Sequence, residues 1–550
     1  MYAKGKNRIT TILIVFIVFL QLYTIFFWAN RKANFYIDEL YSMGYAHTFT
    51  GVSNDPRRIF DSSSWKRGSW CNIDDFKSQL IVHEDESVLS QSIWKTLSQT
   101  IRGRNYFALL NLSESLIFPG EISRWGGIAL NMLIFILFQF SLLRFFRRLH
   151  LQNSTILAAM LMIGFSGYIL SLSVYIRFYL LTNLLLLLTL HLHLIILEDT
   201  RPGVIAVAEI ASILLMYLSF KNSELTLITS GSLIVAFTLV LMIHRRWLRL
   251  ICYAVPFITI PLLYLLSYTP YVDVFLHPGS YSSPSGALGP LATHVMDTSA
   301  PLVVSFFQTY VLNWIKVNLF ARGRVMVSFA AILLLLFGLC LCRHRKAESR
   351  SLASRMQLSF MMAVAFMFVI YNIFIAFTRP EAADFASRYY SFALLLLFLL
   401  LWYAIDRLSR YVNVRASVSA VLSLSFLILA VSVGVFTHRR DLVEYIYLDD
   451  QKAISALKPY DSLDTVLREG SIHASYECVS LRPWNAVLCP VADADSDLPE
   501  TLPDQLLFWT GLNDEKNPVT DELQQRGYSV EHLCDTHISS VYYCHNTQTP

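Results

Sequence analysis

The fold is decided by residues 10–41, which read TTILIVFIVFLQLYTIFFWANRKANFYIDELY. Residues 10–28 carry no charge and are long enough to cross a hydrocarbon core of about 30 Å at about 1.5 Å per residue. The basic stretch MYAKGKNR precedes this segment, and bulky residues follow it where a signal peptide would have a small-residue cleavage site. We therefore expect a retained membrane anchor.

The composition of the whole chain extends this interpretation to the remaining residues. Of 550 residues, 55% are hydrophobic and 15% are charged, and the mean hydropathy is +0.47. Soluble domains are usually about 25% charged, so much of the chain is expected in lipid. The net charge is +4, and the basic residues are spread along the chain, which argues against a nucleic-acid partner.

Apolar segments recur along the chain and predict a mainly α, polytopic membrane protein of about 11 transmembrane helices. Loops rich in Lys and Arg fall on one side, which the positive-inside rule assigns to the cytoplasm. Residues 300–320 are also apolar, but a span there would turn the RHRKAESR loop outward, so we favour a re-entrant or interfacial helix. The spans after the first are expected at 127–143, 154–173, 178–197, 203–219, 225–243, 250–268, 325–342, 357–377, 387–405 and 416–436.

This topology predicts a transmembrane domain over residues 1–436 and a small extracytoplasmic α/β domain over 437–550. The transmembrane domain would have two large outer loops, 30–126 and 269–323. Four of the eight cysteines lie in the tail, and an oxidising outer face would permit two disulfides with three possible connectivities. Their spacing does not suit a zinc site. These cysteines are Cys478, Cys489, Cys534 and Cys544.

Two adjacent acids, Asp38 and Glu39, follow the first span among aromatic residues. They could be the solvated caps of a short helix, where acids complement the helix dipole. A carboxylate held among aromatics at the membrane surface could also be partly desolvated and serve as a general base. The residues alone leave both interpretations open.

Cations are expected at the same outer face, where positive-inside statistics disfavour them. Arg177 precedes the fourth span, Lys221 lies in the outer turn SFKNSE, and Arg388 with Tyr389 begins the tenth span. Each could be a long side chain that reaches the interface from a helix end. Together with Arg379, they favour a lipid-linked phosphate or pyrophosphate as the ligand.

Four motifs, taken in order, resemble the membrane glycosyltransferases of the GT-C superfamily, in particular the branch with protein O-mannosyltransferases and the aminoarabinose transferase of lipid A. They are YIDELY after the first span, ISRWGGIALNMLIF with Arg124 before the second, YIRFYLLTN with Arg177 and Tyr179, and SRYYSFALL with Arg388 and Tyr389. The resemblance covers roughly residues 10–440, and the tail has no counterpart in the family.

The chain departs from the family pattern in three places. No His-Pro-Pro-like stretch closes the first outer loop, where the sequence reads IRGRNYFALLNL. The family often has an acid two or three positions before the arginine of the third motif, whereas Tyr175 and Val174 stand there. The WWDYG signature of oligosaccharyltransferases is missing, so the transfer of a whole oligosaccharide to asparagine is not expected.

The resemblance implies a polyprenyl-phosphate sugar (undecaprenyl- or dolichyl-linked) as donor and a glycan, lipid or protein as acceptor. It assigns Asp38 as general base and Glu39 to orienting the acceptor or a loop amide. Arg177, Lys221, Arg388 and Tyr389 would bind the donor phosphate, and Arg124 and Tyr179 would serve the acceptor or the loop. No nucleotide site is needed, and no cofactor is identified. A divalent metal stays open, although His83 and the acids after it are more typical of a solvated turn.

Other functions share parts of this pattern. A transporter or flippase would use charges in mid-membrane as a substrate path, and a polysaccharide polymerase would also have many spans and outer arginines. A membrane scaffold that presents the tail would leave Asp38 replaceable. The leading location is a bacterial inner membrane with the active face and the tail periplasmic, and the endoplasmic reticulum membrane with a lumenal face is the alternative. The sugar and the acceptor are not identified by the sequence.

Overall fold

The computed structural model describes residues 2–46, 70–72, 80–81, 103–223, 225–267, 352–378, 387–411, 443–468, 487–491, 498, 501–512 and 518–547. Packing divides the chain into two compact units. The helical unit contains Met1–Ile25, Met132–Ser173 and Phe178–Val443, and the loop–tail unit contains Phe26–Asn131, Val174–Arg177 and Glu444–Pro550. This division differs from the expected boundary at 436, because the first outer loop groups with the tail.

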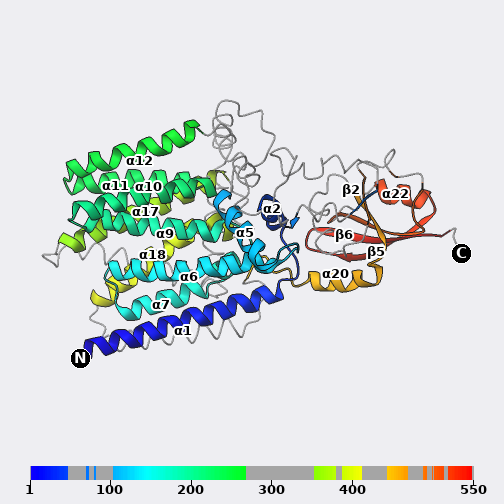
Figure 1. Ribbon diagram of the computed structural model, residues 1–550, viewed down its shortest axis with the longest axis horizontal. Helices are drawn as coiled ribbons and strands as arrows, with labels where there is room; N and C mark the ends of the chain where they lie inside the picture. The colour runs from blue at the N-terminus through cyan, green and yellow to red at the C-terminus, as the bar shows by residue number, and fades with distance from the viewer. Residues whose placement is uncertain are drawn as a thin grey trace. The chain divides into compact units, whose positions relative to one another are not determined.

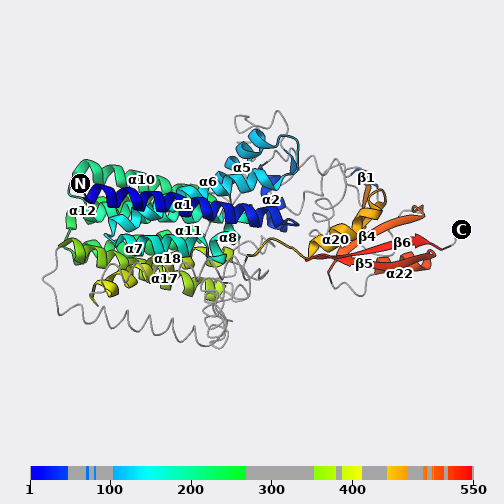
Figure 2. The same ribbon diagram turned by 90° about the horizontal axis from the view of Figure 1, so that it is seen from below.

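The helical unit consists of apolar helices that run side by side in two views (Figures 1 and 2). Helix α9 packs on α10, α11 packs on α17, and α17 packs on α18. Helices α1 (Tyr2–Arg31) and α6 (Arg124–Arg148) contribute residues to both units. The other helices are α7 (Asn153–Gly164), α8 (Gly167–Val174), α9 (Tyr179–Glu198), α10 (Pro202–Asn222), α11 (Leu225–Ile243), α12 (Trp247–Ser267), α17 (Leu352–Thr378) and α18 (Ser387–Tyr411).

Seven helices in the described part of the chain are long and apolar enough to cross a membrane, or eight if the bent pair of α7 and α8 is one span. The two helices of this pair meet at 52°, so the third expected span is broken rather than continuous. A shorter apolar helix, Trp247–Thr259, stands in α12 where the seventh span was expected. The expected spans 325–342 and 416–436 and the interfacial helix at 300–320 lie outside the described residues, so the count of eleven stays a prediction.

Helix α1 shows why these helices are membrane spans. Phe16, Phe19 and Tyr23 lie three or four residues apart and are 60–67% exposed, which gives the helix an apolar outer stripe. Among the polar side chains of the helix, Gln21 is buried, and its Nε2 donates to the carbonyl of Met160 at 2.9 Å. An apolar outer face and an amide that donates to a neighbouring helix suit a helix surrounded by lipid. The chain is a multi-pass membrane protein.

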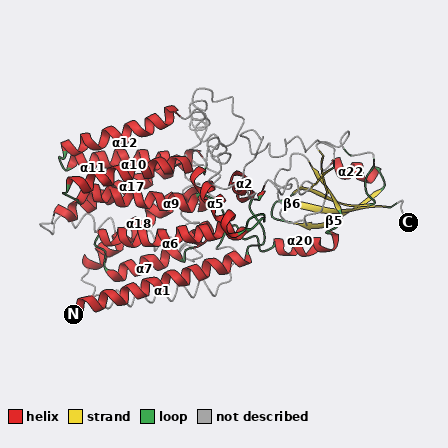
Figure 3. Ribbon diagram, in the orientation of Figure 1, coloured by secondary structure: helices red, strands yellow, loops and turns green. Residues whose placement is uncertain are grey.

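The loop–tail unit combines helices with a sheet (Figure 3). Its helices are α2 (Ile37–Ala46), α5 (Arg104–Ile117), α20 (Asp450–Leu457), the 3-10 helix η4 (Lys458–Tyr460) and α22 (Pro518–Gln525). Its strands are β1 (Cys71–Asn72), β2 (Asp464–Arg468), β3 (Val487–Val491), β4 (Gln505–Gly511), β5 (Tyr528–Asp535) and β6 (Ser539–Asn546).

The six strands form one mixed sheet in the order β1-β3-β2-β4-β6-β5. Strands β3, β2 and β4 are parallel, and the pairs β4–β6, β6–β5 and β1–β3 are antiparallel. A small sheet is therefore present where the sequence predicts the C-terminal domain. Strand β1 belongs to the outer loop 30–126, so the tail does not build this sheet alone.

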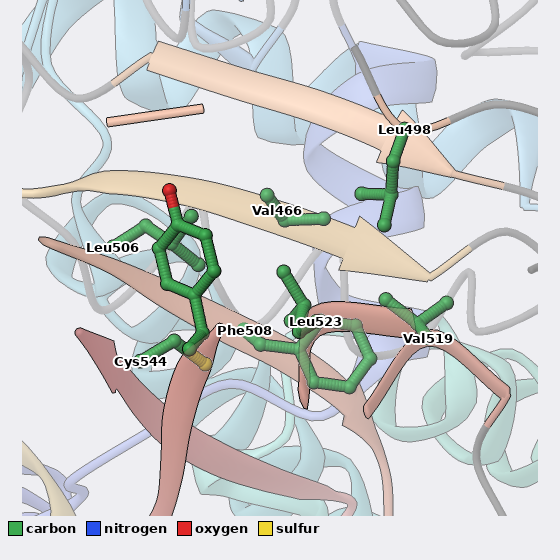
Figure 4. Close-up of a cluster of buried hydrophobic side chains, with 8 residues drawn as sticks. Val466, Leu498, Leu506, Phe508, Val519, Leu523 and Cys544 are labelled. Atoms are coloured by element: carbon green, nitrogen blue, oxygen red, sulfur yellow. The ribbon is translucent and has the colours of Figure 1, made fainter. Parts of the chain in front are cut away.

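One face of the sheet carries a hydrophobic core (Figure 4). Leu506 and Phe508 alternate along β4 toward this core, and α22 contributes Val519 and Leu523 to it. Cys544 on β6 is fully buried in the same cluster.

Cys544 carries a free thiol, and burial raises its pKa to about 12. The expectation that it forms a disulfide is corrected by this finding, because its sulfur packs as an apolar core atom. Cys478 lies outside the described residues, and only the backbone of Cys489 is described. Whether these two and Cys534 form a disulfide stays a prediction.

Candidate active site

The two acids of YIDELY lie in the first turn of α2 and differ in their environment. Oε2 of Glu39, the third residue of the helix, accepts a hydrogen bond from the backbone N–H of Tyr36 at 2.7 Å. This is one half of a capping box, in which the side chain of the third residue bonds back to the residue before the helix. Glu39 is fully buried. The helix-cap interpretation therefore describes Glu39, but the cap is not solvated.

Glu39 forms an ion pair with Lys32, a residue that the sequence analysis did not single out. Nζ of Lys32 lies 2.8 Å from Oε2 of Glu39, and both side chains are buried. Lys32 also donates to the carbonyl of Tyr445, and the backbone N–H of Ile176 donates to Oε1 of Glu39 at 2.8 Å. Burial raises the pKa of Glu39 and lowers that of Lys32, and the contact between the two charges opposes both shifts.

Asp38 stands next to this buried pair but keeps access to solvent. Its side chain is 23% exposed, against 0% for Glu39. The phenol of Tyr175 donates to Oδ2 of Asp38 at 2.9 Å, and Nη2 of Arg177 lies 3.4 Å from Oδ1. A carboxylate fixed by two donors and still partly open can accept a proton from a bound molecule.

Arg177 is itself fixed by several contacts. Its Nη1 donates to the hydroxyl of Ser42 at 3.0 Å, and its guanidinium carbon lies 6.0 Å from the ring centroid of Phe107. Ser42 in turn donates to the carbonyl of Asp38 at 2.8 Å. The side chain of Arg177 is 12% exposed, and its guanidinium lies beside the carboxylate of Asp38. Arg177 can therefore oppose negative charge that develops at this place.

The segment Val174–Arg177 connects α8 to α9 and carries both partners of Asp38. The carbonyl of Tyr175 accepts a hydrogen bond from Nδ2 of Asn131 at 2.8 Å, and Oδ1 of Asn131 accepts one from the phenol of Tyr106 at 3.1 Å. Burial raises the pKa of Tyr106 well above its ordinary value, so this phenol stays a neutral donor. These bonds, with the one to Glu39, hold a non-helical segment in a single position.

Tyrosines from the segment after the helical unit stack on this site. The rings of Tyr175 and Tyr445 are stacked with centroids 3.9 Å apart, and Tyr447 is stacked on Tyr36 at 6.4 Å. Tyr445 and Tyr447 have left-handed backbones, with φ of 66° and 53°. Bulky residues rarely adopt this conformation, so packing must maintain it.

A polar cluster ties the same segment to the first outer loop. Oδ2 of Asp450 accepts hydrogen bonds from Nδ2 of Asn34 at 2.9 Å and from Nδ1 of His537 at 2.6 Å. The ring of His537 stacks on Tyr447 with centroids 3.7 Å apart. Residues from the start and the end of the chain thus meet within the loop–tail unit, which the order of motifs in the sequence does not indicate.

The other predicted site residues lie in several places. Arg124 begins α6 and donates to the carbonyl of Lys32, so it holds the loop that carries the acids. Lys221 lies in the last turn of α10, 4.6 Å from the ring centroid of Tyr217. Arg388 is the second residue of α18, 4.8 Å from the ring centroid of Tyr389. Tyr179 is the buried first residue of α9.

The structure thus brings together Asp38, Glu39, Arg177 and Arg124 within the loop–tail unit. Lys221, Arg388, Tyr389 and Tyr179 belong to the helical unit, and their convergence with Asp38 stays a prediction. Within the described ranges, no three His, Cys, Asp or Glu side chains are grouped to hold a metal ion. His83 and the acids after it lie outside those ranges.

Comparison with known proteins gives a likeness of structure and none of sequence. No protein-family model and no curated protein matches the chain. Among solved structures, ArnT from Cupriavidus metallidurans bound to undecaprenyl phosphate is similar, with 12% identity, coverage of 98% of this chain and 98% of that chain, and a TM-score of 0.45. The apo state of the same protein matches at 12% identity over 99% of this chain and 98% of that chain, with a TM-score of 0.38.

Proposed function

We propose that this protein is a membrane glycosyltransferase that moves a sugar from a polyprenyl-phosphate donor to an acceptor hydroxyl, with Asp38 as general base. The proposal rests on the contacts, the exposure and the position of the Asp38 carboxylate. It is fixed by Tyr175 and Arg177, is 23% exposed, and lies a few residues beyond the end of α1. A lipid-linked sugar would present its reacting carbon at this depth.

The reaction is a displacement at the anomeric carbon. The acceptor hydroxyl gives its proton to Asp38 as its oxygen bonds to the carbon, and the bond from that carbon to the phosphate oxygen breaks. The lipid phosphate leaves with the bonding electron pair and gains negative charge. Arg177, 3.4 Å from Asp38, supplies opposing charge close to this place. Stabilisation of this kind is usually the largest catalytic contribution, and one donor can be worth about 3 kcal/mol.

Two groups of residues complete the proposal. Lys221, Arg388 and Tyr389 bind the donor phosphate from the helical unit. Glu39 and Arg124 position the acid-bearing loop, because Glu39 is fully buried and paired to Lys32 while Arg124 bonds to the backbone of that lysine. The acceptor is a glycan, a lipid or a protein, and Tyr179 belongs with the residues that shape its side of the site.

The active face would be extracytoplasmic, in a bacterial inner membrane or, alternatively, in the endoplasmic reticulum membrane. A transporter or polymerase of lipid-linked glycans is the competing function. The two classes of protein need different properties of Asp38. A transporter needs charged groups along a substrate path, whereas a transferase needs a proton acceptor at one position. A substitution that removes basicity and preserves shape therefore separates them.

The experiment compares Asp38→Asn with Glu121→Gln, which neutralises an exposed acid outside the site. Transfer of radiolabelled sugar from a polyprenyl-phosphate donor is measured in membranes with matched expression. Asp38→Asn is expected to retain donor binding and to lose transfer by about 10² or more, while the control transfers normally. Transfer by Asp38→Asn at the wild-type rate would show that Asp38 is not the base.

A further inference from the structure

The helical unit contains a basic cavity at the C-terminal ends of α6 and α9, away from the residues used above. Its volume is about 550 Å³, within the range of small-molecule sites. It takes arginines from the last turns of α6 and a histidine and a glutamate from α9. The lining residues are Arg144, Arg147, Arg148, His150, His191 and Glu198.

The cavity has more positively charged than negatively charged side chains. Glu198 pairs with Arg148, with Nε 3.0 Å from Oε2, and its Oε1 accepts a hydrogen bond from Gln357 at 2.9 Å. Within the described part of the chain, no carboxylate lies at ion-pair distance from Arg144 or Arg147. Glu198 is the one acid among the lining residues and is already paired with Arg148, so Arg144 and Arg147 are available to bind an anion.

His191 also lines this cavity. Its Nδ1 is buried and has no hydrogen-bond partner within the described ranges. A buried polar atom without a partner costs free energy unless a ligand or water satisfies it. A bound phosphate ester could satisfy this nitrogen only after the ring turns toward the cavity, so the arginines are the groups that make the cavity complementary to a phosphate ester.

An apolar stripe on α6 leads directly to the two arginines. Leu133, Leu137 and Phe140 are 54%, 49% and 44% exposed, and Arg144 and Arg147 continue the same alternation of four and three residues. Positions at this spacing share one face of a helix. The stripe would contact the acyl chain of a lipid whose headgroup reaches the arginines. A free anion would bind the arginines without contacting the stripe.

We propose that this cavity binds one anionic phospholipid, with the phosphate at Arg144 and Arg147 and an acyl chain along Leu133, Leu137 and Phe140. Basic pockets between membrane helices are suited to anionic headgroups. The site is independent of the proposed transferase function, since it uses none of the residues assigned to that reaction.

The test uses the purified full-length protein in neutral detergent, with binding followed by native mass spectrometry. Dioleoylphosphatidylglycerol is the probe, dioleoylphosphatidylcholine is the neutral lipid, and glycerol 1-phosphate and inorganic phosphate are the arms without acyl chains. We expect saturable one-to-one binding of phosphatidylglycerol alone. Equal binding of either water-soluble phosphate would overturn the assignment of a lipid, and unsaturable binding of both lipids would overturn the site.

A matched pair of double variants locates the binding. Arg144→Gln with Arg147→Gln should bind phosphatidylglycerol about 30-fold more weakly, because each arginine near an anionic headgroup contributes a factor of about five. Arg201→Gln with Arg245→Gln removes the same charge from exposed residues outside the cavity and should bind as the wild type. If both pairs lose binding equally, net charge and not this cavity holds the lipid, and the proposal fails.

Discussion

The phenol of Tyr175 donates a hydrogen bond of 2.9 Å to Asp38, and the ring of the same tyrosine stacks on Tyr445 at 3.9 Å. The GT-C pattern often has an acid close to this position. A second carboxylate at this distance from Asp38 would repel it or share a proton with it. A tyrosine instead donates to Oδ2 of Asp38 and so fixes the oxygen that does not face Arg177.

Replacing Tyr175 by Phe should lower turnover without unfolding the protein. The ring and its stacking on Tyr445 are kept, and only the hydrogen bond to Asp38 is lost. Hydrogen bonds to charged groups are worth about 1.5–3 kcal/mol, so kcat should fall about tenfold or more. The apparent KM for the donor should change little, because the phenol bonds to Asp38 and is not among the phosphate-binding residues.

Tyr23→Phe is the matched control for this prediction, since Tyr23 lies exposed on α1. Initial rates at several donor concentrations and thermal unfolding are measured for both variants. An unchanged kcat in Tyr175→Phe would mean that Asp38 does not need this hydrogen bond for its function.

Replacing Lys32 by Met should destabilise the loop–tail unit by about 3–5 kcal/mol, the usual cost of leaving one charge of a buried pair without its partner. Lys32 is 1% exposed and Glu39 is 0% exposed. The double variant Lys32→Met, Glu39→Gln removes both charges and should recover part of the loss. If both variants unfold at the same temperature as the wild type, the pair does not stabilise the fold.

The stability that the loop–tail unit loses in Lys32→Met should also depend on pH. Burial raises the pKa of Glu39, and the variant removes the lysine that opposes this shift. A carboxyl group whose folded pKa lies above its unfolded value of about 4.3 favours the folded state only while it is protonated. The difference in unfolding free energy from the wild type should therefore be small near pH 4 and should grow as the pH rises through the folded pKa.

The sequence analysis located the long apolar helices of the described residues because periodicity and charge are local properties. It also singled out Asp38 and Arg177, which the structure places 3.4 Å apart, while their role stays a prediction. It could not find Lys32, whose position next to Arg31 is typical of a basic residue at the interface. What distinguishes Lys32 is its burial against Glu39 and Tyr445, and a contact across more than 400 positions, 445 against 32, has no local signature. Tyr175 was noticed only as a departure from a pattern.

The contacts that group the loop 30–126 with the tail are likewise not local. Strand β1 pairs with β3 across residues 71 and 488, and Asn34 bonds to Asp450. Neither contact changes the composition or the hydropathy of the segments involved, so the loop 30–126 and the tail looked separate. The disulfide expectation failed at Cys544 because cysteine number and compartment predict pairing on average, while the core environment of one thiol is a tertiary property.

Cys544 should resist alkylation in the folded protein. Its thiol is buried, and its pKa is raised to about 12, so almost no thiolate forms at pH 8. Its modification by maleimide, mapped by mass spectrometry, should require unfolding, and the same thiol in the denatured protein serves as the positive control. Rapid modification of native Cys544 would contradict this assignment.

The same shift predicts the stability of the loop–tail unit at alkaline pH. A thiol has an unfolded pKa of about 8.5, and the folded value lies above it, so the stabilisation is complete below about pH 8.5. It is lost as the pH rises toward 12, by up to about 1.4 kcal/mol per pH unit. Cys544→Ala should show a weaker decline over that range, although its stability at pH 7 is lower because it leaves a cavity.

Substitutions at Tyr445 should separate the contribution that the side chain makes to stability from the contribution of the left-handed backbone. Its ring stacks on Tyr175, and its φ of 66° is one that glycine adopts readily and other residues adopt at a cost. Tyr445→Ala and Tyr445→Gly both lose the ring, but only the glycine relieves the left-handed backbone. Tyr445→Gly should therefore be more stable than Tyr445→Ala by about 1 kcal/mol, as measured by thermal or denaturant unfolding.

Because the ring of Tyr445 supports the phenol that fixes Asp38, both variants should have reduced kcat, while Tyr445→Phe should retain the stacking and most of the turnover. If Tyr445→Ala transfers sugar as fast as Tyr445→Phe, the segment after the helical unit does not position the acid, and the stacking is only a structural contact.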